Sequence, residues 1–162
     1  MSTEQVPITK ISINDELHRT EGLVTLSDFK TGDWPEATFD LSATLGDVIT
    51  SASRKFVKDS PISILIEDEI EKSDKIKFIT WQLMTVANIE IVEGGAILKH
   101  EGKELKVENL THPEINFSVI SLSPAPLELD KQIEGLKRLE LRIPVWTIEG
   151  DKTKITIRLA GN

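Results

Sequence analysis

The feature that most constrains this chain is an alternation of apolar and polar residues with a period of two. The alternation is clearest in Ile115–Val119, Leu139–Val145 and Ile155–Leu159. Successive side chains of a β-strand point to opposite faces, so this pattern is typical of strands with one buried and one hydrated face. No segment carries a long helical stripe with caps. The sequence therefore predicts an all-β protein.

Further strand-like segments recur at a spacing of roughly ten residues, which fits an antiparallel β-sandwich better than βαβ units. Glu101-Gly102-Lys103 separates two of them and has the composition of a hairpin turn. We predict an antiparallel β-sandwich of about ten to twelve strands. The additional strands are expected at Ile8–Ile13, Gly22–Leu26, Ala37–Leu41, Ile62–Glu67, Ile76–Met84, Ile89–Val92, Ala96–His100 and Glu104–Glu108.

The chain of 162 residues fits one domain, and we expect residues 1–162 to form a single sandwich with frayed residues 1–7. The prolines near residue 124 and the polar residues after them predict a long loop at about 123–135. One stretch stays ambiguous. Leu45–Thr50 has apolar residues at helical spacing, so it predicts either strand or a short helical turn that leads into a strand at Ser51–Val57.

Composition excludes several classes of function. The formal charge is −8, with 27 acidic and 19 basic residues and no basic cluster, so we expect no nucleic-acid partner. No apolar run approaches the ~20 residues of a membrane helix, and the first ten residues lack the features of a signal peptide. The absence of cysteine excludes disulfides and thiolate zinc sites, and no histidine pair has metal-ligand spacing. We therefore expect neither a metal nor a cofactor.

The segment Ala37–Thr85 sets one polar residue into each of its predicted strands: Asp40, Arg54, Asp68 and Thr85. Apolar residues flank each of the four, so these polar groups are not simply a hydrated edge. An Arg with two carboxylates predicts a partly buried network that ties strands together. A second reading makes Arg54 a fork for a substrate carboxylate. An Arg already neutralised by acids is a poor receptor, which favours the structural reading.

The same segment resembles the C-terminal β-domain of heparinase II/III-like polysaccharide lyases. The motifs that carry the resemblance are Asp40-Leu41-Ser42, Arg54, Asp68-Glu69, and Trp81 followed by Thr85. The likeness extends from about Gly22 to Gly161 through AILKHEGKELKV, FSVISLSPAP and ITIRLAG. One departure is Met84, where the family often has a histidine before the threonine.

The resemblance implies a non-catalytic C-terminal domain of a longer lyase. The α/α-toroid and the upstream His-rich and His-Asn motifs of the family, which hold its catalytic residues, have no counterpart in this chain. Such a parent would cleave uronic-acid glycans, glycosaminoglycans among them, by β-elimination in the periplasm or after secretion. The partners implied are the toroid, the remaining β-domain and an acidic polysaccharide. The chain by itself is then expected to be inactive, bracing the catalytic region and lining the substrate groove.

Two other functions remain open. A uronate lyase needs a base and a group that neutralises the carboxylate, and His18 with Arg19 is the one pair that offers both. His100 and His112 are expected in hydrated loops. A self-standing carbohydrate-binding module would instead use exposed aromatic rings, for which Trp34 and Trp146 are the candidates. Packing against a neighbouring domain competes with sugar stacking at Trp34, and Trp81 is expected in the core.

Overall fold

The computed structural model describes residues 9–14, 24–43, 45, 49–124 and 132–162. These residues form an all-β sandwich, as the alternation predicts, with all strand pairs antiparallel. The twelve strands in the described part are β1 (Thr9–Ile13), β2 (Thr25–Lys30), β3 (Glu36–Asp40), β4 (Ile49–Ser60), β5 (Ser63–Lys72), β6 (Phe78–Thr85), β7 (Asn88–Val92), β8 (Gly95–His100), β9 (Lys103–Asn109), β10 (Ser118–Ser121), β11 (Lys137–Pro144) and β12 (Lys152–Gly161).

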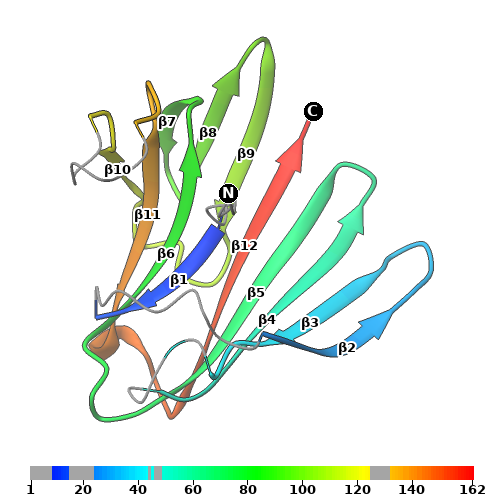
Figure 1. The fold of residues 1–162 in the computed structure, drawn as a ribbon, viewed down its shortest axis with the longest axis vertical. Coiled ribbons are helices and arrows are strands. Elements are labelled where there is room, and N and C mark those ends of the chain that lie inside the picture. Colours follow the sequence, from blue (N-terminus) through cyan, green and yellow to red (C-terminus); the bar gives the residue numbers. More distant parts are fainter. Residues whose placement is uncertain (1–8, 15–23, 44, 46–48, 125–131) are drawn as a thin grey trace.

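The strands form two sheets of unequal size (Figure 1). The smaller has four strands in the order β1-β6-β11-β10, and the larger has eight in the order β2-β3-β4-β5-β12-β9-β8-β7. Figure 1 shows β2 and β3 at the end of the larger sheet that lies farthest from β10 and β11. The larger sheet therefore extends beyond the smaller one on this side.

The core lies between the two sheets and is built from the inward residues of the alternating strands. Trp81 on β6 has no exposed surface, and Leu139, Leu141 and Ile143 on β11 are equally buried. The Trp81 ring meets Phe117 edge to face, with the centroids 6.1 Å apart. The larger sheet contributes side chains such as Ile157, which completes a continuous apolar interior. The predicted core position of Trp81 is confirmed.

Several predicted strands differ at their ends. β2 continues past Leu26 to Lys30, and β4 is longer than the predicted Ser51–Val57. Ile49 and Thr50, part of the predicted helical turn, belong to β4, whereas residues 44 and 46–48 lie outside the described residues. The long loop predicted at about 123–135 falls largely on residues 125–131, which are also outside them. Leu122 N–H donates to the Leu136 carbonyl (2.8 Å) at the base of that loop.

The strand predicted at Ile115–Val119 is wrong in its first half, because β10 spans Ser118–Ser121. Ile115 N–H donates to the His112 carbonyl (2.9 Å), and the Asn109 side-chain amide donates to the carbonyls of both residues. These bonds hold a turn after β9, so β10 begins only at Ser118. A side-chain amide thus takes the place of a strand partner.

Candidate functional site

Two of the four polar residues of the predicted network form a buried ion pair. Arg54 on β4 and Asp68 on β5 are opposite one another in the strand register. Arg54 Nε donates to Asp68 Oδ1 (2.6 Å) and Arg54 Nη2 donates to Oδ2 (2.9 Å), which makes the pair bidentate. Asp68 has no exposed surface and Arg54 is 6% exposed. Alternation places both side chains toward the smaller sheet.

Arg54 also links the two sheets. Its Nη1 donates to the carbonyl of Thr9 (3.1 Å) and to the Thr9 hydroxyl (2.8 Å), and Thr9 is the first residue of β1. Four bonds therefore hold a guanidinium that has five N–H donors. Burial raises the pKa of Asp68, and the Arg54 guanidinium opposes this shift. The pair is a fastening between sheets, with little capacity left for a substrate carboxylate.

Asp40 and Thr85 do not join this pair. Asp40 lies opposite Ser53 on β4, so it points to the other face of the sheet from Arg54. Its carboxylate accepts the Ser42 N–H (2.9 Å) in a local turn, and the bonds from Ser42 lower the pKa of Asp40. Thr85 belongs to the smaller sheet, where its hydroxyl accepts the Ala87 N–H (3.0 Å). The structure thus brings together two of the four residues.

The two aromatic candidates lie at separate places on the surface. Trp146 sits in a 3₁₀ turn, Val145–Thr147, that follows β11, and it is 83% exposed. Trp34 lies in the connection between β2 and β3 and is 53% exposed. That connection turns at Gly32, whose φ of +126° favours glycine. Both rings are open to solvent.

His18 and Arg19 lie outside the described residues. His100 is exposed at the end of β8, with its Nε2 3.8 Å from a Glu101 carboxylate oxygen. His112, expected in a hydrated loop, is instead buried in the turn that Asn109 holds. Burial lowers the pKa of His112, and its Nδ1 lies 3.1 Å from the Thr111 hydroxyl. In the part of the chain that the structure describes, no three potential metal-ligating side chains come together.

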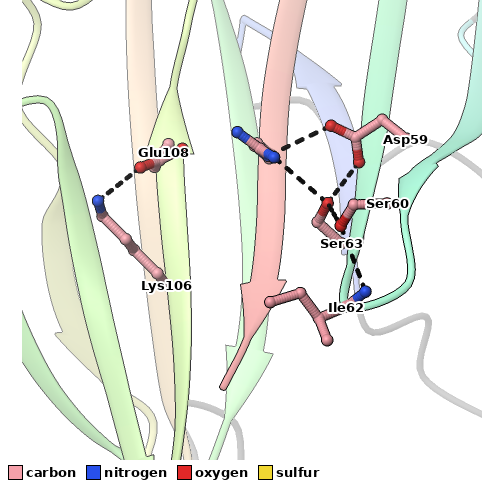
Figure 2. A network of polar contacts seen from close by, with 7 residues as sticks. Asp59, Ser60, Ile62, Ser63, Lys106 and Glu108 are labelled. Carbon is pink, nitrogen blue, oxygen red and sulfur yellow. Dashed lines mark hydrogen bonds and ion pairs between the residues drawn. The ribbon is translucent and has the colours of Figure 1, made fainter.

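A second polar cluster, which the sequence did not reveal, lies at the turn between β4 and β5 (Figure 2). Ser63 donates to an Asp59 carboxylate oxygen (2.6 Å), and the Ser60 and Ser63 hydroxyls lie 2.5 Å apart. Arg158 on β12 completes it, with its Nε 3.3 Å from Asp59. Ser63 and Arg158 are 95 residues apart in the sequence, so no local motif marks the cluster. Each charge has an opposite partner, which indicates a brace for the turn.

Beside this turn the inner face of the larger sheet carries a shallow groove of about 360 Å³. Its walls are mostly apolar, from Ile62, Ile64, Leu105 and Leu159, and Lys58 supplies the one charged side chain. Among the described residues there is no helix that is long and apolar enough to cross a membrane. The groove offers mainly apolar contact, with Lys58 and Ser63 as its polar side chains.

No protein-family model and no curated protein sequence matches this chain. Solved structures do match. Heparinase III superimposes with a TM-score of 0.67 at 9% identity, covering 93% of this chain and 23% of that chain. The heparan sulfate lyase HepC from Pedobacter heparinus gives 0.64 at 9% identity, and a mutant of it gives 0.66 at 7%, with the same coverage. At these identities the likeness concerns the fold: this chain has the β-sandwich fold that occupies about a quarter of those lyase chains.

Proposed function

We propose that this chain is a non-catalytic C-terminal β-sandwich domain of a heparinase II/III-like polysaccharide lyase. The main support for this proposal is that 93% of the chain superimposes on only 23% of heparinase III, so the likeness concerns one unit of a longer protein. The parent protein would cleave uronic-acid glycans by β-elimination, and this domain would brace its catalytic region and line the substrate groove. Its catalytic residues would lie in an α/α-toroid and in the rest of the β-domain.

The state of Arg54 supports a structural role. A receptor for a substrate uronate needs free N–H donors at an accessible surface. Arg54 is 6% exposed, and its donors already bind Asp68 and Thr9. The two histidines that the structure describes add no constellation, since His100 and His112 lie at separate turns and differ in exposure. These facts favour a scaffold over a catalyst.

The proposal has a direct test in the protein encoded by the complete natural reading frame. That protein, incubated with heparan sulfate and other uronic-acid glycans, is expected to release unsaturated uronate, which absorbs in the ultraviolet. We expect it to be exported to the periplasm or beyond. If the complete protein eliminates none of these glycans, the proposed function is wrong.

Trp146 favours a second candidate function, a carbohydrate-binding module. A ring that is 83% exposed on a 3₁₀ turn is suited to stacking on a sugar. Calorimetric titration of the chain with acidic glycan fragments would show binding that Trp146→Ala abolishes and Trp34→Phe leaves intact. Without measurable binding, this candidate fails and the scaffold stands alone. The third reading, an eliminating enzyme that uses His18 and Arg19, requires product from the chain alone.

A further inference from the structure

Large apolar side chains gather on the surface at one end of the larger sheet. Val24, Leu26, Phe29 and Trp34 are 47%, 53%, 58% and 53% exposed, and they fall within eleven residues of sequence. Single exposed apolar residues are ordinary, but a contiguous group on a soluble protein marks a surface that meets a partner. This group lies on the β2–β3 hairpin, at the sheet end farthest from β10 and β11 (Figure 1).

The strand register shows which face Leu26 and Phe29 occupy. Leu26 lies opposite Phe39, and Phe39 lies opposite Arg54, whose side chain points toward the smaller sheet. A bulge between Leu26 and Asp28 changes the alternation, so Phe29, opposite Ala37, points to the same side. We call the surface formed by Leu26, Phe29, Phe39 and the neighbouring Phe56 the hairpin patch.

The hairpin patch continues the core. The rings of Phe39 and Phe56 meet edge to face with centroids 6.0 Å apart, and Phe56 packs against the buried apolar cluster. Arg54 lies at the junction and is already buried. The inner face of β2 and β3 therefore has the composition of a core surface, yet Leu26 and Phe29 keep more than half of their surface exposed.

The open edge of β2 is poorly suited to another strand. β2 stands at the end of the sheet, with β3 as its strand neighbour. The Phe29 N–H donates to its neighbour Asp28 (2.9 Å), and the bulge interrupts the regular spacing of backbone groups. A side-chain cap and a bulge both hinder edge-to-edge pairing. A partner would therefore contact the face of the hairpin and not its edge.

The charged side chains of β2 and β3 lie on the opposite face. Glu36 forms ion pairs with Lys30 (3.5 Å) and Lys55 (3.2 Å), and the register places these residues away from Leu26 and Phe29. The inner face of β2 and β3 offers apolar surface without a cation for a carboxylate or sulfate. This composition suits the apolar surface of another protein segment and not an acidic glycan.

We propose that the hairpin patch is the surface on which the rest of a longer lyase chain packs. The inference rests on the proposed function, because the occupant is the remainder of the same polypeptide. In heparinase III the matching unit is 23% of the chain, so most of that protein lies outside it. A second copy of this chain fits less well, because each copy carries a formal charge of −8.

Trp34 lies in the connection between β2 and β3, the two strands that carry most of the hairpin patch, so quenching of its fluorescence reports whether a partner covers this hairpin, without relying on activity. Acrylamide should quench Trp34 and Trp146 in the 162-residue chain but not the buried Trp81, and Trp34→Phe and Trp146→Phe separate the two contributions. In the protein from the complete reading frame, the contribution lost in Trp34→Phe should fall to the level of Trp81. Equal quenching of Trp34 in the two proteins would overturn the inference.

A substitution pair assigns the contact. In the complete protein, Phe29→Ser should restore the quenching of Trp34, whereas Ile91→Ser, at the opposite edge strand β7, should leave it low. Both positions are exposed, and an unchanged thermal midpoint of the 162-residue variants checks that they fold. If the 162-residue chain dimerises with Trp34 shielded, the occupant is a second copy and the inference is overturned. Lyase activity with Trp34 still quenched would refute the inference while leaving the proposed function in place.

Discussion

Asp68→Leu tests whether the buried pair is a structural fastening. Leu has the same branched shape and the same number of heavy side-chain atoms but accepts no hydrogen bond, so the substitution leaves Arg54 Nε and Nη2 without their partners in a site where Arg54 is 6% exposed. Removing one partner of a buried ion pair costs about 3–5 kcal/mol, because an unpaired charge remains. For a chain of this size that corresponds to a fall in Tm of roughly 10 °C.

Urea unfolding followed by tryptophan fluorescence, in a Trp34→Phe, Trp146→Phe background that leaves the buried Trp81, measures the loss. Lys106→Met is the matched control, since it breaks an ion pair with Glu108 (2.6 Å) in which Lys106 is 56% exposed. Exposed pairs contribute about 0.2–1 kcal/mol. The double variant Arg54→Met, Asp68→Leu should recover most of the stability, because no charge is then buried. A loss below about 1 kcal/mol for Asp68→Leu, equal to that of the control, would mean that the Arg54–Asp68 pair does not fasten the sheets.

Three further predictions concern single positions. Burial lowers the pKa of His112 below its unfolded value of about 6.5, so the neutral His112 stabilises the fold fully above that pH and less as the pH falls below it. The free energy of unfolding in urea should differ between about pH 8 and about pH 5, and His112→Gln should reduce this difference. An unchanged difference would count against His112 as its source. Asn109→Ala should cost about 1–3 kcal/mol in the same assay, because the Ile115 carbonyl loses the Asn109 amide and the His112 N–H loses its acceptor. A neutral result would mean that the turn holds without the Asn109 side chain. Gly95→Ala should cost about 1–3 kcal/mol, since the added Cβ would collide with the Val107 carbonyl oxygen. Its control, Gly161→Ala, meets only an ordinary contact at 3.7 Å and should change stability by less than about 0.5 kcal/mol, so equal effects would contradict the expected collision.

The fold was largely predictable because strand alternation depends only on local sequence. The turn that joins His100 to Lys103 shows this well, because its two residues, Glu101 and Gly102, have positive φ values of 48° and 77°. The pairing of Arg54 with Asp68 was also within reach, since both are polar residues set among apolar neighbours. What alternation does not give is the order of strands in the sheets.

The remaining differences follow from register and from long-range contact. Asp40 is excluded from the pair because strand pairing sets it opposite Ser53, on the other face, and shifting a register by one residue reverses the faces. Thr85 is excluded because β6 belongs to the smaller sheet. His112 is buried in the turn where its N–H donates to the Asn109 side chain, and no residue pattern signals this hydrogen bond.

We propose that this sandwich belongs to a lyase without performing its chemistry. The most direct measurement compares the 162-residue chain and the protein from the complete reading frame, at equal molar concentration, on heparan sulfate and other uronic-acid glycans. We predict ultraviolet absorbance from unsaturated uronate with the complete protein and none with the chain. Product formed by the chain alone would contradict the account, because the eliminating residues would then have to lie within it.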